Sequence, residues 1–183
     1  MKVLIPAYTG LGNFILKTPF INSLKTLYPN IKIDVVFGLP FGAEKVLHNS
    51  DLINETFWLP INSSFQKKIG FFRFFSKRSY DYVFFPFDSC PPFFLYLSFF
   101  FLKGSNFVGH INLHQKRCKG RIFELTKYLL FPNQKWISTT IGRHEIDVNL
   151  DLLNLVLEKP GHFERETIIS WSLDKYLPFD LPI

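Results

Sequence analysis

The sequence predicts a domain of the α/β class, built on a doubly wound parallel sheet. Short segments rich in β-branched and aromatic residues alternate with amphipathic stretches of about 10 to 15 residues. The short segments are apolar throughout, as expected of parallel strands that helices cover on both faces. The chain has 183 residues, which suffices for one well-packed domain.

Five strands are expected, with the most apolar one in the middle of the sheet. They cover residues 2–5, 31–37, 53–59, 80–87 and 106–109. The segment 80–87 is a continuous apolar run, which is typical of a central parallel strand. The segment 31–37 is also too apolar for an exposed edge strand.

Helices are expected between these strands, and prolines define several of their ends. They cover residues 13–28, 41–48, 65–76, 91–102, 121–130 and 143–157. Pro19 interrupts the first helix, which is therefore expected to kink or to begin a second segment there. Ser63 and Ser64 are suited to cap the helix that begins at residue 65.

Aromatic side chains dominate the expected core. The chain contains 23 Phe, 7 Tyr and 3 Trp residues, and 47% of its residues are hydrophobic, which excludes a disordered protein. Its two cysteines, Cys90 and Cys118, lack metal-ligand spacing and are too few for a disulfide framework. Reduced thiols, as in a cytoplasmic protein, are expected.

Positive charge is concentrated in the first part of the chain. Residues 1–143 carry 18 Lys and Arg against 7 Asp and Glu, a net charge of +11, whereas residues 144–183 carry 3 against 8, a net charge of −5. The basic stretches 67–78 and 116–135 either attract anionic partners, such as phosphorylated sugars or lipid head groups, or form a solvated surface. Nucleic acid is unfavoured, because these residues lie in no recognition motif.

Residues 82–102 form the segment closest to a membrane span. Pro86, Asp88 and two further prolines interrupt its first half, which leaves 11 uninterrupted residues at 92–102. As a helix these residues rise about 16 Å, against about 30 Å of hydrocarbon in a bilayer. A buried strand, a turn and a buried helix are therefore expected, and no segment has the pattern of a signal peptide.

The loop after the first strand is the first candidate binding site. Its residues Thr9, Gly10, Leu11 and Gly12 stand between a strand and a helix, where backbone amides can face an anion and glycines permit a positive φ and close approach of a ligand. A dinucleotide-binding fingerprint is excluded, because it requires glycine where Ile15 stands. A P-loop is excluded, because Leu16 precedes Lys17. A tight turn without a ligand remains the alternative.

Several segments of this chain resemble one known family. They are MKVLI at 1–5, GLGNFILKTP at 10–19 and IKIDVVFG at 31–38, with YDYVFF at 80–85 and RHEIDVNLDLL at 143–153. In this order they are similar to glycosyltransferase family 9, the lipopolysaccharide heptosyltransferases and their relatives. The first three are fairly specific to the opening of that family, and the resemblance covers about residues 1–157.

The resemblance implies a GT-B architecture, in which two Rossmann-like domains face each other. Residues 1–160 would be the N-terminal, acceptor-side domain, and residues 161–183 a linker or the start of a donor-binding domain. The implied reaction is an inverting, metal-independent transfer from a nucleotide-sugar, which is a co-substrate rather than a cofactor, to a phosphorylated glycolipid. It would take place in the cytoplasm, at the inner face of a bacterial inner membrane. The chain would then be a fragment, a truncated product or half of a split enzyme with a separate donor-domain subunit.

The family's catalytic aspartate is replaced in this chain. Heptosyltransferases place an aspartate directly after the glycine loop, and this chain has Asn13 there. An amide can orient a hydroxyl group but cannot take its proton. Substitute bases near strand ends are Asp88 and His144, for which a turn or helix cap and the first turn of a surface helix are the alternatives.

A histidine pair and a basic helix complete the candidates. His110 and His114 are four residues apart, as in a helical metal site, but they follow a strand and lack a third ligand, so loop histidines and no metal are expected. Lys67, Lys68 and Arg73 lie in an aromatic, basic helix. These cations either face a phosphorylated acceptor or an anionic membrane, or extend outward while the rings pack into the core.

Two functions follow from these observations. The first is the acceptor-binding half of a heptosyltransferase-like enzyme, which would be silent without its donor half. The second is a catalytically inactive half-domain that binds a glycan, an anionic lipid surface or a partner subunit, and Asn13 favours it.

Overall fold

The computed structural model describes residues 1–40, 51–87, 90–112, 118–139 and 142–157, and they form an α/β domain around one parallel sheet. The strands are β1 (Lys2–Ala7), β2 (Lys32–Phe37), β3 (Glu55–Trp58), β4 (Tyr82–Phe85), β5 (Asn106–Ile111) and β6 (Lys135–Ser138). They are hydrogen-bonded in the order β3-β2-β1-β4-β5-β6, and every neighbouring pair is parallel. The prediction of a doubly wound parallel sheet is therefore confirmed.

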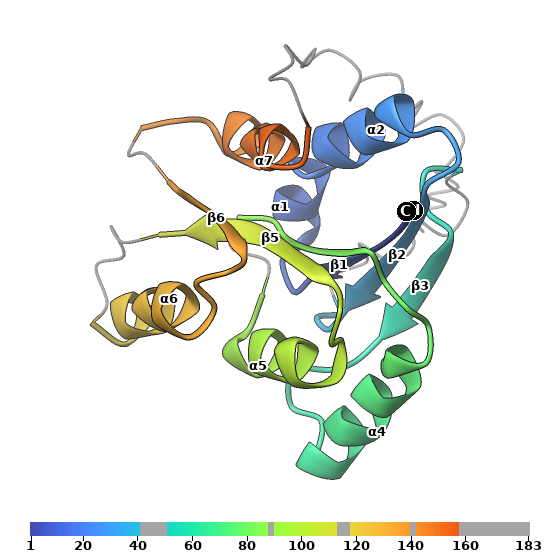
Figure 1. Cartoon of the computed structure of the whole chain (residues 1–183), viewed down its shortest axis with the longest axis vertical. Coiled ribbons are helices and arrows are strands. Elements are labelled where there is room, and N and C mark those ends of the chain that lie inside the picture. Colours follow the sequence, from blue (N-terminus) through green and yellow to red (C-terminus); the bar gives the residue numbers. More distant parts are fainter. Residues whose placement is uncertain (41–50, 88–89, 113–117, 140–141, 158–183) are drawn as a thin grey trace, which may run out of the picture.

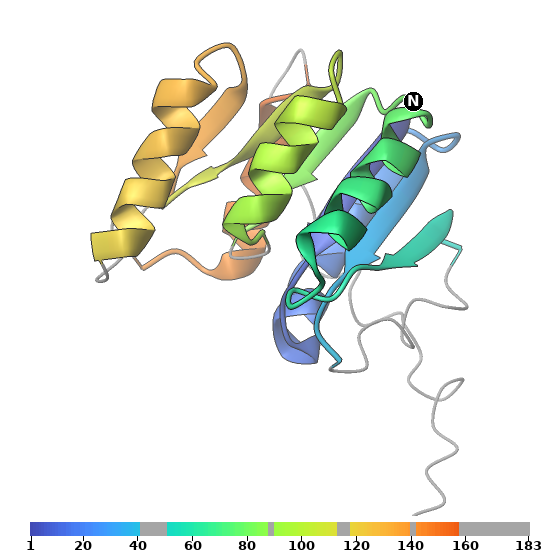
Figure 2. The same ribbon diagram turned by 90° about the horizontal axis from the view of Figure 1, so that it is seen from below.

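Helices cover both faces of this sheet (Figure 1). On one face lie α1 (Leu11–Ile15), α2 (Thr18–Leu27) and α7 (Glu145–Asn154). On the other face lie α4 (Phe65–Ser76), α5 (Pro92–Phe101) and α6 (Cys118–Leu130). Figure 2 shows α4, α5 and α6 side by side across that second face.

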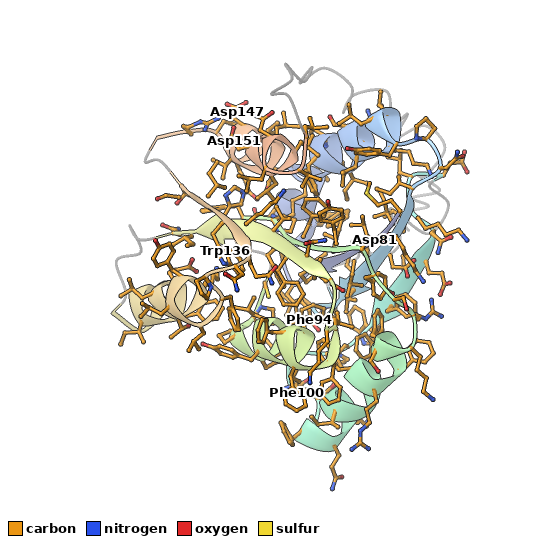
Figure 3. All side chains as sticks on the ribbon, viewed as in Figure 1. Asp81, Phe94, Phe100, Trp136, Asp147 and Asp151 are labelled. Carbon is orange, nitrogen blue, oxygen red and sulfur yellow. The ribbon has the colours of Figure 1, made fainter. Side chains whose placement is uncertain are left out.

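Each face of the sheet has its own core, because strand side chains alternate between the two faces. In β1, Val3 and Ile5 pack with the face that α1, α2 and α7 cover, whereas Leu4 packs with the face that α4 and α5 cover. The second core is built on aromatic rings, as the composition predicts. Fully buried Phe72 of α4 and Phe94 of α5 meet there in an edge-to-face pair with centroids 5.0 Å apart. Figure 3 labels Phe94 on α5.

The structure differs from the sequence-based expectations at several elements. The sheet has a sixth strand, β6, which was not predicted. It is a four-residue strand at the end of the sheet with exposed ends, so it lacks the continuous apolar run that marks the inner strands. The expected strand over 80–87 is restricted to β4, since Pro86 has no amide to donate to a ladder.

The first helix divides where Pro19 predicts a new segment. Helix α1 begins at Leu11 rather than at residue 13 and ends at Ile15, and α2 then begins at Thr18. Pro19 occupies the first turn of α2, where its missing amide would have no intrahelical partner.

A buried carboxylate ties the amino-terminal ends of the strands together. Asp34 of β2 has no exposed surface, and it accepts hydrogen bonds from the Tyr80 hydroxyl at 2.7 Å and the Asn54 amide at 2.8 Å. Lys2 Nζ lies 3.3 Å from it and Arg78 Nη1 3.8 Å. Burial and the bond to Asp34 raise the pKa of the Tyr80 hydroxyl, so Tyr80 remains a donor.

Besides His114, three expectations fall outside the described residues. They are the helix over 41–48, the placement of Asp88, and the linker over 161–183 with its boundary at residue 160. Among the helices of the described residues, none has the length and hydropathy needed to cross a bilayer.

Candidate functional site at the carboxyl ends of the strands

The strand order places a switch point between β1 and β4. Chain connections run outward in opposite directions from these two strands, so the loops at their carboxyl ends diverge and leave room for a ligand. The loop after β1 begins at Tyr8, and the loop after β4 begins at Pro86. These loops and the helices that contact them form the candidate site.

The glycine loop presents an accessible surface at this point. Leu11, Gly12 and Asn13 are exposed and Gly10 is half-buried, whereas Thr9 is buried. A Cβ atom added at Gly10 or Gly12 would meet nothing within 4 Å. Packing within the described chain therefore does not require glycine here, and the absent side chains leave the backbone open to a ligand.

Gly10 and Gly12 do not use the positive φ that glycine permits. Gly10 has a φ of −66° as the residue before α1, and the glycines with positive φ among the described residues are Gly104 and Gly142. Close approach of a ligand to the backbone, rather than an unusual backbone conformation, is the remaining reason for glycine at 10 and 12.

Tyr8 fixes the start of the loop. Its hydroxyl donates a hydrogen bond of 2.8 Å to the Leu59 carbonyl, which follows β3. The ring lies against Gly38 at the end of β2, where an added Cβ would approach a Tyr8 ring carbon to 1.9 Å. Glycine at position 38 is therefore required, since any other residue would displace the Tyr8 ring.

Lys17 connects the glycine loop to the last described helix. Its side chain has no exposed surface, and its ammonium group donates to the Asn13 carbonyl at 3.0 Å and to a Glu145 carboxylate oxygen at 2.6 Å. Because Glu145 is the first residue of α7, this ion pair holds the α1–α2 turn against the start of α7.

Helix α7 also contacts the loop after β4. The buried Asn149 side chain accepts a hydrogen bond of 2.8 Å from the Phe87 amide. Its Nδ2 atom and the Thr9 hydroxyl have no hydrogen-bond partner within the described part of the chain. Buried polar groups normally have partners, so these two are available to a bound molecule or to water.

The catalytic candidates are placed unequally. Asn13 is exposed, and its carbonyl is joined through Lys17 to Glu145, the residue after His144. His144 is the exposed N-cap of α7, where its Nδ1 accepts from the Ile146 amide at 3.3 Å. The described structure thus brings Asn13 and the start of α7 to the same end of the sheet.

The basic candidates on α4 are divided between its two ends. The Lys68 ammonium lies 4.1 Å from the centroid of the Phe93 ring, and Phe93 contacts Tyr8 edge-to-face at 5.8 Å. Lys67 is exposed in the same first turn. The Ser64 hydroxyl caps the helix by accepting a hydrogen bond of 3.4 Å from the Lys67 amide. Arg73 lies about 9 Å further along the helix axis, away from the loop.

Helix α4 packs its aromatic rings into the core only in part. Phe72 and Phe75 are buried, as in a core helix, whereas Phe65 and Phe74 are exposed. The helix therefore both packs on the sheet and presents an apolar, basic surface.

His110 does not lie in a loop as expected. It belongs to β5 and is buried, and burial together with the Lys127 ammonium lowers its pKa to about 3. His114 is outside the described residues. Within the described residues no group of three or more His, Cys, Asp or Glu side chains is arranged to hold a metal ion.

Two residues of the site were missed in the sequence. Lys17 enters the sequence analysis only in the excluded P-loop pattern, although a lysine beside Phe14 and Ile21 on an apolar helix face indicates a buried partner. Asn149 stands among leucines in α7, and a polar residue on a buried face signals a specific hydrogen bond.

The chain matches one domain of solved glycosyltransferase family 9 structures. It superposes on a family 9 glycosyl transferase from Veillonella parvula with a TM-score of 0.57 and 17% identity, covering 89% of this chain and 44% of that chain. For E. coli heptosyltransferase WaaC with ADP-2-deoxy-2-fluoro heptose the TM-score is 0.64 at 17% identity, with coverages of 98% and 56%. For E. coli ADP-heptose lipopolysaccharide heptosyltransferase II it is 0.56 at 16% identity, with coverages of 83% and 40%.

These matches confirm the resemblance at the level of the fold. The chain spans about half the length of the solved enzymes, so it corresponds to one domain of a GT-B heptosyltransferase. No protein-family model and no curated protein sequence matches it.

Proposed function

We propose that this chain is the acceptor-binding half of a heptosyltransferase-like glycosyltransferase. The observation that carries the proposal is the exposed glycine loop at the β1–β4 switch point, in a domain with the fold of about half of such an enzyme. In this proposal residues 1–160 form the acceptor-side domain. Residues 161–183 are a linker or the start of a donor-binding domain, and the alternative partner of the chain is a separate donor-domain subunit.

The reaction of the complete enzyme is a displacement at the anomeric carbon of a nucleotide-sugar. An acceptor hydroxyl on a lipopolysaccharide core or another cell-envelope saccharide attacks that carbon with inversion. The bond to the nucleoside diphosphate breaks and a base takes the hydroxyl proton. In this chain Thr9 and Asn13 orient the hydroxyl, and His144 or Asp88 is left to take the proton, because an amide cannot.

A second candidate function is favoured by Asn13 itself. With an amide in place of the family's carboxylate, the domain binds a glycan, an anionic lipid surface or a partner subunit without catalysis. The glycine loop and its contacts with α7 serve this function equally, since binding requires no base.

In this proposal the domain binds the acceptor lipid at an anionic membrane surface on the cytoplasmic side. The face formed by α4, α5 and α6 exposes ten large apolar side chains, and Figure 3 shows one of them, Phe100, on α5. They are Phe65, Phe74, Tyr96, Phe99, Phe100, Ile122, Leu125, Tyr128, Leu129 and Leu130. The acidic residue of these helices is Glu124, which is buried in a pair with Lys127. Exposed basic residues beside apolar ones suit anionic lipid.

The site is tested by acceptor binding to the purified chain. Calorimetry is expected to show binding of a lipopolysaccharide core oligosaccharide, without release of ADP from ADP-heptose by the chain alone. The variant Gly12→Trp is expected to abolish binding, and Gly70→Trp, at an equally open glycine on α4, to leave it unchanged. Equal binding by both variants would contradict the proposed site.

The two candidate functions are separated by supplying a donor half. Addition of the donor-binding domain of a heptosyltransferase restores transfer to the natural chain if the first function is correct. If only Asn13→Asp shows transfer, the natural domain is a binding module.

The membrane contact has its own test. The chain is expected to co-sediment with vesicles containing phosphatidylglycerol. The double variant Phe100→Glu, Leu129→Glu is expected to remain in the supernatant. Leu27→Glu on α2, an exposed leucine on the opposite face of the sheet, is the matched control.

A further inference from the structure

A cavity of about 120 Å³ lies beside β4, β5 and α6, apart from the glycine loop. Its walls include Phe85 and Phe87 from β4 and the residues after it, Asn112 after β5, and Glu124 and Lys127 of α6. By the same measure one water molecule needs about 10 to 15 Å³. The cavity therefore admits a molecule of about ten heavy atoms, which is the size of a single sugar ring.

A buried ion pair forms one side of this cavity. Glu124 and Lys127 are 4% and 8% exposed, and the Lys127 ammonium lies 2.8 and 2.9 Å from the two Glu124 carboxylate oxygens. It also donates to the His110 carbonyl at 3.1 Å, and the Asn112 amide donates to Glu124 at 2.8 Å. A buried ion pair is a poor source of stability, which favours a role for this one in recognition.

The cavity carries no net charge near neutral pH. The charges of Glu124 and Lys127 compensate each other, and His110, with its lowered pKa, is neutral. Burial raises the pKa of the Cys90 thiol, so this wall is neutral as well. A phosphate or carboxylate ligand would meet the Glu124 carboxylate without an unpaired cation to balance it.

Apolar and polar groups are combined in the cavity in the way that a sugar ring requires. The Phe85, Phe87 and Phe123 rings offer flat apolar walls for the C–H face of a pyranose. The Glu124 carboxylate accepts from hydroxyl groups, and the Lys127 ammonium donates to them. His110 also lines the cavity, and its carbonyl oxygen accepts a hydrogen bond from the Lys127 ammonium.

We propose that this cavity binds a neutral pyranose ring through Glu124, Lys127 and the surrounding phenylalanine rings. The site goes beyond the proposed function, because it uses different residues from the glycine loop and offers no unpaired charge to a phosphorylated acceptor. Sugar binding here does not require that the chain takes part in transfer.

The test is saturation-transfer NMR on the whole chain with methyl glucoside, methyl galactoside and methyl mannoside as probes. At least one pyranoside is expected to bind with a Kd of about 1 mM or weaker, as a ligand of this size allows. Inorganic phosphate at the same concentration is expected not to displace it. Absence of binding by all three pyranosides, or displacement by phosphate, would overturn the proposal.

Variants locate the binding. Phe123→Leu is expected to weaken binding at least fivefold, whereas Phe101→Leu, a half-buried ring on the same face of the sheet but outside the cavity, retains it. The double variant Glu124→Gln, Lys127→Gln removes both charges together and is expected to weaken binding further. Gly12→Trp is expected to retain pyranoside binding. Loss of binding in Gly12→Trp, or unchanged binding in Phe123→Leu, would assign the sugar elsewhere.

Discussion

The Lys17 ammonium and the Glu145 carboxylate lie 2.6 Å apart, although 128 positions separate them in the sequence. Lys17 follows the glycine loop and Glu145 begins α7, so one ion pair joins the first and the last described helical regions of the domain. Lys17 also donates to the Asn13 carbonyl. The conformation of the loop near the start of the chain therefore depends on α7, the last described helix.

Replacement of Lys17 by Met is expected to destabilise the fold by about 3 kcal/mol, because it leaves the Glu145 carboxylate without its cation. Urea unfolding measures the change. Glu145→Gln is expected to cost less, since Glu145 is partly exposed, and the double variant is expected to cost less than the sum of the two. Additive costs would show that the two side chains do not interact.

Replacement of Gly38 by Ala is expected to lower the free energy of unfolding by about 2 kcal/mol or more. The new methyl group would overlap the Tyr8 ring and the Leu59 carbonyl, so the buried ring has to move. Gly70→Ala is the matched control on α4, where the added methyl meets open space and is expected to stabilise the helix by about 1 kcal/mol. Equal effects of the two variants would contradict the Tyr8 contact.

Replacement of Asp34 by Asn is expected to destabilise the domain by about 3 kcal/mol, because Lys2 and Arg78 lose their buried counter-charge. Tyr80→Phe removes one hydrogen bond to the same carboxylate and is expected to cost about 2 kcal/mol. Asp81→Asn, at an exposed carboxylate, is the control and is expected to cost less than about 1 kcal/mol. Chemical denaturation at pH 7 distinguishes these values.

His110 makes the stability of the fold depend on pH. Its pKa is about 3 in the folded chain and about 6.5 in an unfolded one. Below pH 6.5 the unfolded chain therefore binds a proton that the folded chain does not, and stability falls as the pH falls. Between pH 6.5 and 5 the loss is about 2 kcal/mol, before most carboxylates titrate.

The control for this pH dependence is His110→Gln, which is expected to flatten the slope between pH 7 and 5. His144→Gln changes an exposed histidine and is expected to leave the slope as it is. An unchanged slope in His110→Gln would show that a different titrating group causes the pH dependence.

The sequence predicts the inner strands well, because a central parallel strand is a continuous apolar run. That pattern identifies β1, β2, β4 and β5, but it does not identify the short edge strand β6. Trp136 of β6 packs against the backbone of Gly109, where a Cβ atom would approach its ring to 2.7 Å. This is a tertiary contact, and the local pattern of residues 135–138 does not predict it.

The position of the glycine loop follows from sequence alone, whereas its supports do not. The segment from Thr9 to Asn13 follows an apolar strand and runs into α1, which begins at Leu11, and the order of strand, glycines and helix is visible in the residues themselves. The pairing of Lys17 with Glu145, and of Asn149 with the Phe87 amide, depends on how α7 packs over distant strands. Burial of His110 likewise depends on β6 and α7, which cover β5.

The two contacts of α7 have a consequence for how the protein is made. A growing chain displays its glycine loop within the first 13 residues, but Lys17 finds its counterion only after about 145 residues have left the ribosome. Until then the Lys17 ammonium, which is buried in the folded domain, remains hydrated. The earliest part of the polypeptide is therefore among the last to acquire its mature shape.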